Sequence, residues 1–482
     1  MDALLVIVPS EPTDSVFQHL PDSERWQELN ARSKPVPGTV RTTVLTNRRQ
    51  TLAVLGYIGA DVSTFERLSL AGRMFKEASA RTPRSVGLMA FGDAPKAEGA
   101  MEALLAAGLA CAFQMPAYRS RKDDSKSNDE GRIERLILLG STKVDIPYAI
   151  ASARGNNLVR WLTALPPNKL DSAGYHATVA KLARKHKLGF NWYDEAALKR
   201  LGANAFLAVA AANATRDAGI AHLTYRPKAN KSRSPDITLV GKGILFDTGG
   251  VNLKPHRSML DMHTDMSGSA VALATLLALA ELEAPLAVDA WLAITENQIG
   301  PTAYRPQEVI TASNGVTIQV IHTDAEGRMV LADTLALASR TKPRFMIDFA
   351  TLTGAAVYSL TERMSGVLTN RQPLATTLVE AGRTSGERVW NFPLDADYDT
   401  DLESKVADIM QCSADSKGDH ILATRILNRF VPEELPWAHV DLSASTRTGG
   451  LAHINTEITG FGVRYALELI LKHDILGAAG RK

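Results

Sequence analysis

Short apolar runs alternate with longer amphipathic segments along the first 142 residues. The apolar runs are LLVIV (4–8), TLAVLGYI (51–58), SVGLMAF (85–91) and RLILLG (135–140). Between them lie segments such as TFERLSLAGRMFKEASA (64–80), whose apolar residues recur at helical spacing. Strands that alternate with helices predict β-α-β units and a mainly parallel sheet.

Residues 146–165 carry apolar residues at helical spacing, and Pro166 and Pro167 then prevent the helix from continuing. A chain of 482 residues exceeds the roughly 250–300 residues that one hydrophobic core organises. We therefore expect an N-terminal α/β domain at residues 1–145, a linker helix at 146–168 and a larger domain at 169–482.

The second half repeats this alternation on a larger scale. Strands are predicted at 222–226, 237–246, 287–294 and 345–352, and helices at 267–282, 328–339 and 460–473. Asn314-Gly315 separates two further apolar runs and is typical of a tight hairpin turn, and Asp419-His420 before apolar residues predicts a helix start. The expected fold class is α/β, with a smaller N-terminal domain and a larger C-terminal domain containing a mixed, mainly parallel sheet.

Composition excludes several classes of protein. Hydrophobic residues make up 45% and charged residues 22%, as in ordinary globular proteins, and a net charge of +2 provides no strong field for nucleic acid or an anionic membrane. The longest apolar stretch, near residues 270–280, is shorter than the ~20 residues that span a bilayer, and the N-terminus lacks the pattern of a signal peptide. We expect a cytoplasmic protein with no membrane association. The only cysteines, Cys111 and Cys412, exclude a disulfide framework.

Acids and bases are concentrated just past the apolar strands of the second half. The segments VGKGILFDTGG (240–250), LKP (253–255), DMSG (265–268) and HTDAEGR (322–328) contribute Lys242, Asp247, Lys254, Asp265, Asp324, Glu326 and Arg328. Ligand sites in open α/β sheets lie outside the carboxyl ends of the strands. This placement predicts a functional site.

Four carboxylates cannot share a pocket unless they are protonated or neutralised, because like charges raise one another's pKa. Two divalent metal ions would balance them if Lys242 bound as a neutral amine, since the pKa of a lysine falls in a desolvated site beside cations. Lys254 and Arg328 would then be surplus positive charge. Such charge suits an anion such as the oxyanion that develops in amide hydrolysis.

Plainer interpretations exist for each residue alone. Asp324 and Glu326 are also typical of an ordinary helix N-terminus, Lys242 could extend outwards from its strand, and Met262 could be core packing. His322 favours a hydrogen-bonded or core position over a metal ligand. The chain contains neither the GxSxG motif of serine hydrolases nor the P-loop pattern.

Together these segments resemble the signature blocks of the leucyl aminopeptidase (cytosol aminopeptidase) family. The resemblance rests on VGKGILFDTGG, LKP, DMSGSA and TDAEGRMVLADTL, and on TAYRPQEVITASNG, DFATLTGA and TGFGVR in the same order. It extends over about residues 156–464. It implies a metal-dependent aminopeptidase that hydrolyses the N-terminal bond of peptides with a water bridging two divalent metals.

The resemblance also implies a role for each residue. Metal ligands would be Asp247 and Glu326, which bridge or flank both ions, Asp324 at one ion, and Lys242 and Asp265 at the other. Lys254 would stabilise the oxyanion, and Arg328 would hold bicarbonate as general base. Substrate-pocket residues would be Met262, Thr351, Leu352 (through its carbonyl) and Gly354. The donor set suits Zn²⁺ or Mn²⁺.

The family further implies a homohexamer that acts on peptides. His322, Ser267 and Ser269 depart from its usual residues and leave substrate preference open. Two rival functions remain: a DNA-binding or regulatory role, for which the basic clusters at 119–126 and 228–233 are the candidates, and a catalytically silent scaffold. A scaffold gives no reason for Lys254 and Arg328 to accompany four acids.

Overall fold

The computed structural model describes residues 1–11, 14–120, 132–228, 232, 234–415 and 417–480. The chain forms two compact units. The first comprises Met1–Ala153, Arg383–Gly386 and Arg447–Thr459, and the second comprises Arg154–Gly382, Glu387–Thr446 and Gly460–Lys482. Helix α5 (Ile146–Thr163) occupies the segment expected to link two domains and contains the point of division. The two later segments of the first unit were not predicted from the sequence pattern.

The first unit is built on a five-stranded sheet in the order β2-β3-β1-β4-β5. The β2–β3 pair is antiparallel and the other pairs are parallel. Its elements are β1 (Ala3–Pro9), α1 (Asp14–Gln18), α2 (Ser23–Arg32), β2 (Val40–Val44), β3 (Leu52–Ile58), α3 (Thr64–Ser79), β4 (Ser85–Ala90), α4 (Ala94–Cys111) and β5 (Arg135–Leu138). The predicted strands and helix are present, whereas β2 was not predicted.

Alternate residues of β1 show why this sheet is covered on both faces. Leu5 and Ile7 pack with apolar residues of α3 and α4, while Leu4 and Val6 belong to a second core with Trp26 of α2. Successive side chains of a strand point to opposite faces, so a continuous apolar run requires two covering layers.

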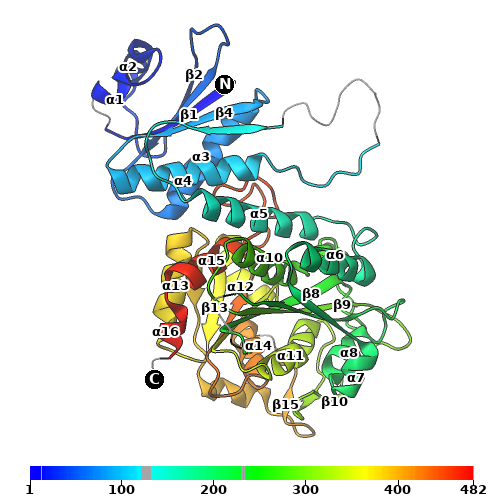
Figure 1. The fold of residues 1–482 in the computed structure, drawn as a ribbon. Coiled ribbons are helices and arrows are strands. Elements are labelled where there is room, and N and C mark those ends of the chain that lie inside the picture. The colour runs from blue at the N-terminus through cyan, green and yellow to red at the C-terminus, as the bar shows by residue number, and fades with distance from the viewer. Residues whose placement is uncertain (12–13, 121–131, 229–231, 233, 416, 481–482) are drawn as a thin grey trace. The chain divides into compact units, whose positions relative to one another are not determined.

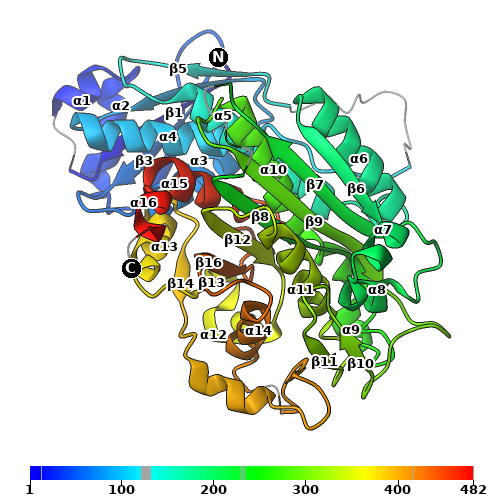
Figure 2. The same ribbon diagram turned by 60° about the horizontal axis from the view of Figure 1, so that its bottom comes forward.

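The second unit contains an eight-stranded sheet in the order β14-β13-β16-β12-β8-β9-β7-β6 and a small sheet in the order β10-β11-β15. Its strands are β6 (Gly189–Asp194), β7 (Gly219–Tyr225), β8 (Ile237–Asp247), β9 (Val288–Asn297), β10 (Val309–Thr311), β11 (Thr317–Gln319), β12 (Phe345–Ala350), β13 (Ser365–Thr369), β14 (Val389–Asn391), β15 (Ile409–Met410) and β16 (Trp437–Asp441). The large sheet is mixed, with parallel pairing through β16-β12-β8-β9. Figure 2 shows β7, β8 and β9 within this sheet; β9 lies between β7 and β8, which are consecutive in sequence.

Helices cover both faces of this large sheet. In Figure 1, α6, α10 and α15 lie on one face, and α8, α11 and α14 lie on the other. The helices are α6 (Ser172–Lys185), α7 (Glu195–Arg200), α8 (Asn204–Ala210), α9 (His256–Met259), α10 (Ser267–Glu281), α11 (Glu326–Ser339), α12 (Gly354–Leu360), α13 (Leu374–Ser385), α14 (Asp419–Asn428), α15 (Val463–Lys472) and α16 (Ile475–Ala479), with short 3₁₀ turns η1 (Met262–Thr264), η2 (Thr361–Arg363) and η3 (Ala396–Leu402).

These elements confirm the predicted α/β fold class and the main predictions for this half. Helices α10, α11 and α15 lie in the predicted segments, and α14 begins at Asp419 as expected. Strands β10 and β11 pair antiparallel across Asn314-Gly315, where Gly315 has a φ of 93°. In the part of the chain that is described, no helix has the length and apolar character needed to cross a membrane. Most of both basic clusters, at residues 121–126, 229–231 and 233, lies outside the described residues.

Candidate metal site

Four neighbouring strands deliver polar side chains to one edge of the large sheet. Strand β8 ends at Asp247, β9 at Asn297 and β16 at Asp441, while Thr351 directly follows β12. These four strands are mutually parallel, so their carboxyl ends lie at the same edge. The sheet thereby gathers residues that are up to 194 positions apart, from Asp247 to Asp441.

Lys242 lies at the buried end of this group. Its Nζ is 2.8 Å from a carboxylate oxygen of Asp265 and 2.9 Å from one of Glu326, and it donates to the Thr351 carbonyl at 3.0 Å. A Cβ at Gly327 would lie 2.7 Å from Cε of Lys242. Glycine therefore allows the start of α11 to approach the lysine.

Lys254 lies at the more open end. Its Nζ is 2.9 Å from Asp247 and 2.6 Å from Asp324. The other oxygen of Asp247 accepts hydrogen bonds from Asn297 Nδ2 at 2.8 Å and from the Gly249 amide at 2.9 Å. Gly249 has a φ of 86°, a backbone conformation that favours glycine in this turn.

We call Asp247, Asp265, Asp324 and Glu326 the acid cluster. Single carboxylate oxygens of Asp247, Asp265 and Glu326 lie within 4.8 Å of one another, and all three residues are buried. Among the described residues, no donor forms a hydrogen bond to Oε2 of Glu326. A buried carboxylate oxygen without a partner is costly, which favours a ligand that the protein itself does not supply.

The electrostatics of the acid cluster agree with this interpretation. Burial, together with the charge of Asp247, raises the pKa of Glu326 to about 8. Burial also raises the pKa of Asp265 to about 6, although the charge of Lys242 opposes the shift. Burial and the charge of Asp247 raise the pKa of Asp324. Carboxyl groups held this way bind protons or metal ions readily.

The donor set fits divalent metal ions. Four acids and two lysines carry a net charge of −2 when ionised (+2 from Lys242 and Lys254, −4 from the acid cluster), and hard carboxylate oxygens suit Zn²⁺ or Mn²⁺. Burial alone would lower the pKa of Lys242, but the charges of Asp265 and Glu326 raise it above its ordinary value. In these contacts Lys242 is an ammonium. Its binding as a neutral amine therefore remains a prediction for the metal-loaded protein.

A cavity of about 350 Å³ adjoins the acid cluster. The four residues expected to form the substrate pocket all line it: Met262, Thr351, Leu352 and Gly354. Asp441 holds this wall in place, because its carboxylate accepts hydrogen bonds from the Leu352 amide at 3.1 Å and the Thr353 hydroxyl at 2.6 Å.

Arg328 does not line that cavity. Its guanidinium donates two hydrogen bonds to Asp419, from Nη1 to Oδ1 at 2.9 Å and from Nη2 to Oδ2 at 2.8 Å. Asp419, an acid outside the recognised motifs, therefore balances the charge of Arg328. Lys254 contacts Asp247 and Asp324, and its surplus charge stays a prediction for the metal-loaded protein. The count of charges left out Asp419 because it considered only acids within the recognised motifs.

His322 is exposed and lies outside the core, but it has the hydrogen-bonded position that the sequence favoured as one alternative. Its Nδ1 accepts a hydrogen bond from the Asp324 amide at 3.3 Å. The hydroxyl of Ser269, another departure from the family pattern, donates to the Met266 carbonyl at 2.7 Å and lies 3.0 Å from the Tyr175 hydroxyl.

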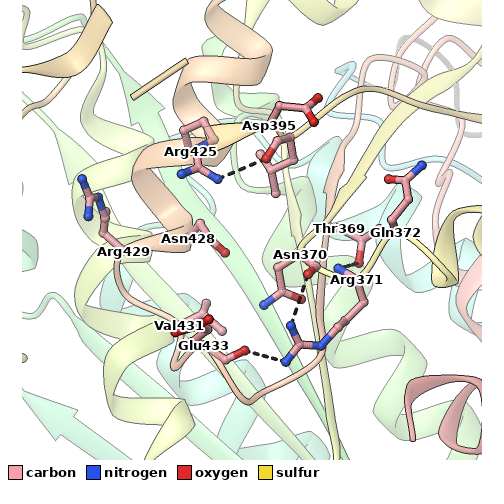
Figure 3. Close-up of a pocket in the computed structure, with 11 residues that line it drawn as sticks. Thr369, Asn370, Arg371, Gln372, Asp395, Arg425, Asn428, Arg429, Val431 and Glu433 are labelled. Carbon is pink, nitrogen blue, oxygen red and sulfur yellow. Dashed lines mark hydrogen bonds between the residues drawn. The ribbon is translucent and has the colours of Figure 1, made fainter. Parts of the chain in front are cut away.

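Another cavity, of about 470 Å³, is rich in arginine but lacks a group of acids (Figure 3). Its polar groups are largely paired with one another. Arg425 donates to the Leu394 carbonyl and to Asp399, and Arg371 donates to the Glu433 carbonyl. This cavity offers nothing comparable to the acid cluster.

Three residues of the site escaped the sequence analysis: Asn297, Asp441 and Asp419. Asn297 and Asp441 end apolar strands, and the same strand-end criterion applied to VDAWLAITEN (288–297) and WAHVD (437–441) could have found them. Asp419 was recognised as a helix start, but no local pattern indicates its distant partner Arg328.

Comparisons with known proteins agree with this geometry. The catalytic-domain model of the cytosol aminopeptidase family matches residues 157–467. A probable cytosol aminopeptidase of Parasynechococcus marenigrum is 36% identical over 442 residues, covering 90% of this chain and 88% of the relative. One from a Synechococcus species is 33% identical over 481 residues, covering 98% and 96%.

Solved structures of similar fold cover nearly the whole chain. A mutant of tomato leucine aminopeptidase superposes with a TM-score of 0.85 at 28% identity, covering 98% of this chain and 94% of that one. The bottromycin maturation enzyme BotP in complex with Mn superposes with a TM-score of 0.83 at 28% identity, covering 97% and 98%.

Proposed function

The chain belongs to the cytosol aminopeptidase family and is therefore a peptidase, and we propose that it hydrolyses the N-terminal bond of peptides with two divalent metal ions held by its acid cluster. The single observation that carries the proposal is the convergence of Asp247, Asp265 and Glu326. Their oxygens lie within 4.8 Å of one another, and Glu326 keeps an unpartnered oxygen.

The proposed ligands form two neighbouring metal sites that share two acids. Asp265 and Lys242 would hold one ion and Asp324 the other, with Asp247 and Glu326 shared between them. A metal pair supplies Lewis-acid polarisation of the scissile carbonyl and lowers the pKa of the attacking water. The protein fixes the distances, because each acid is already held by a lysine, an amide or a side chain before any metal binds.

Lys254 has the best position for a developing oxyanion. Its ammonium is 14% exposed and lies at the cavity side of the acid cluster, where it contacts Asp247 and Asp324. Burial opposes its charge, but the neighbouring acids raise the pKa of Lys254 and keep it protonated. A fixed positive charge beside the reacting carbonyl stabilises the transition state more than the ground state.

The cavity defines where the substrate would lie. We propose that Met262 and Gly354 contact the first side chain of the peptide, and that Thr351 and the Leu352 carbonyl border the reacting centre. Thr351 also donates a hydrogen bond to Asp265 at 2.6 Å, so this wall and the metal ligands are positioned together.

Manganese is bound in one similar structure, and zinc suits the same donors, so both metals are candidates. The names of the relatives favour a cytoplasmic location, and the family resemblance favours a homohexamer. A DNA-binding role has little support, because the net charge is only +2. A silent scaffold would not need an unpartnered buried acid.

Substitution of the ligands tests the proposal. Asp324→Ala or Glu326→Ala should abolish hydrolysis of aminoacyl-anilides and reduce the bound Mn or Zn measured by elemental analysis. Glu362→Ala is the matched control, because Glu362 lines the same cavity without belonging to the acid cluster, and it should keep its metal. Wild-type turnover by either ligand variant would refute the assignment.

A further inference from the structure

The pairing of Arg328 sets a limit on what else this arginine can bind. Arg328 belongs to α11 and is only 3% exposed. Its two Nη groups form parallel hydrogen bonds with the two oxygens of Asp419, and Nη1 also donates to the Gln411 carbonyl at 3.2 Å. Two parallel bonds to one carboxylate are the strongest geometry that a guanidinium offers.

A bicarbonate ion at Arg328 would have to share the guanidinium with the carboxylate of Asp419. Of the guanidinium nitrogens, only Nε forms no hydrogen bond with a described residue. Its N–H and the second N–H of Nη2 form the other fork of the guanidinium, but Nε is closed off from solvent. Asp419 already balances the charge of Arg328, so a second anion would add an uncompensated negative charge to a buried site, and this opposes bicarbonate binding while Asp419 is in place.

Asp419 is well placed to remain on the arginine. It is the first residue of α14, a helix of ten residues, and helix N-termini favour negative charge. Burial works against its ionisation, but the charge and hydrogen bonds of Arg328 hold the pKa of Asp419 below its ordinary value. The carboxylate is thus an ion at neutral pH.

The Arg328–Asp419 pair is joined to the loop that carries the metal ligands. Gln411, whose carbonyl accepts from Arg328, uses its side chain to bind the segment before Glu326. Its Oε1 accepts from the His322 amide at 3.2 Å, and its Nε2 donates to the Ala325 carbonyl at 2.9 Å. A change at the pair can therefore reach Asp324 and Glu326.

We propose that the carboxylate of Asp419 is the anion bound by Arg328. It takes the place of the bicarbonate ion that the family resemblance implies at this arginine. Asp419 is a positioning residue that acts through Arg328. The inference rests on the proposed peptidase function. It makes the activity independent of dissolved bicarbonate.

Bicarbonate dependence is the direct test. Wild-type protein loaded with Mn²⁺ is assayed on an aminoacyl-anilide in degassed, bicarbonate-free buffer and again with added bicarbonate. The two rates should agree within about twofold. Asp419→Ala should lose roughly 10–100-fold in kcat in the first buffer. Bicarbonate should restore that loss saturably, because the small anion fills the vacated fork.

Thermal melting of the metal-free protein provides a readout that needs no activity. Bicarbonate should raise the melting temperature of Asp419→Ala and leave that of the wild type unchanged. Asp419→Asn, which keeps the shape of the side chain and loses its charge, serves if the alanine variant does not fold. It should also melt below the wild type.

Asp399 of η3 provides a matched control, because its partner Arg425 lies on the same helix as Asp419. It forms an equivalent two-bond pair with Arg425 of α14, at 2.7 and 2.6 Å, away from the acid cluster; Figure 3 shows Arg425. Asp399→Ala should lose stability, but bicarbonate should not change its rate.

Three results would overturn the inference: a wild-type rate that falls without bicarbonate and recovers with it, an Asp419→Ala rate equal to wild type in bicarbonate-free buffer, or an Asp419→Ala protein that bicarbonate neither reactivates nor stabilises. Failure of the proposed function looks different, since the metal-loaded wild type would then hydrolyse no substrate in either buffer. The melting comparison would still report on Asp419 in that case.

Discussion

Asp348 and the acid cluster both lie at the eight-stranded sheet, but their carboxylate oxygens differ in whether they have hydrogen-bond partners. Asp348 lies in the middle of β12, fully buried, and both of its oxygens are occupied: Trp437 Nε1 donates at 2.8 Å and His439 Nδ1 lies at 2.7 Å. In the acid cluster, by contrast, Glu326 is equally inaccessible but retains an oxygen without a hydrogen bond from any described residue.

Position along the strands explains the difference. Asp348 and His439 are directly opposite in the β12–β16 register, and Trp437 is two residues from His439, so all three side chains lie on one face of the sheet. The acid cluster lies beside a cavity at the carboxyl edge of the sheet, and Glu326 comes from the start of α11 rather than from a strand. Asp348 is thus satisfied by its neighbours within the sheet, whereas Glu326 faces the cavity beyond the carboxyl ends of the strands, where ligands of open α/β sheets bind.

Removal of metal should separate the two groups most strongly. A chelator should reduce hydrolysis by roughly a thousandfold or more, because the acid cluster then lacks the charge that activates water. It should also destabilise the protein by about 4 kcal/mol if the metal had been present at a thousand times its Kd. The checks are initial rates and melting curves before and after dialysis, with reloading by Mn²⁺ or Zn²⁺.

The Asp348→Asn variant is the control for metal removal. It should respond to the chelator just as the wild type does, since Asp348 contacts Trp437 and His439 rather than the metal ligands. A wild type that keeps its rate and its melting temperature after complete removal of metal would contradict the comparison.

Matched substitutions should then have opposite effects on stability. Asp348→Asn should lower the free energy of unfolding by about 1–3 kcal/mol, because one partner of a satisfied buried network is lost. Glu326→Gln, tested without metal, should cost nothing or stabilise the protein, because burial raises the pKa of Glu326 to about 8 and the neutral amide replaces a carboxyl that resists ionisation at pH 7. Urea unfolding at pH 7 measures both.

Activity should reverse that order. The metal-loaded Glu326→Gln variant should be inactive, and Asp348→Asn should retain a kcat/KM close to that of the wild type. A large loss of stability in metal-free Glu326→Gln would show that the acid cluster is closed after all.

A smaller effect should appear in the pH dependence of stability. Burial opposes the charge of His439, but the charge and hydrogen bond of Asp348 raise the pKa of His439 above its ordinary value. A group whose folded pKa is raised contributes stability below its unfolded pKa of about 6.5, and this contribution is lost as the pH rises through the folded pKa.

The difference in unfolding free energy between wild type and Asp348→Asn should therefore shrink as the pH increases from 6 towards 9. Urea titrations of both proteins at several pH values measure that difference and cancel the titration of unrelated groups. A difference that does not vary with pH would mean that Asp348 does not raise the pKa of His439.

The sequence by itself determined the fold class, most strands and helices, and the residue types of the acid cluster. Apolar periodicity reports burial of a strand or helix directly, which is why β1, β3, β8 and α10 could be located. The motifs at 240–250 and 322–328 identified charged residues of the site, because several charges beside buried strands are costly unless a ligand or an opposite charge balances them.

The tertiary structure alone decided which charges face one another. Lys254 contacts Asp324, 70 positions away, and Arg328 meets Asp419, 91 positions away. The insertion of β9 between β7 and β8, and the short strand β2, likewise follow from packing. The sequence gives the type of each side chain and its neighbours along the chain. Its partner across the fold depends on where separate strands and helices end in space. The local pattern of residues carries no information about the distance between those ends.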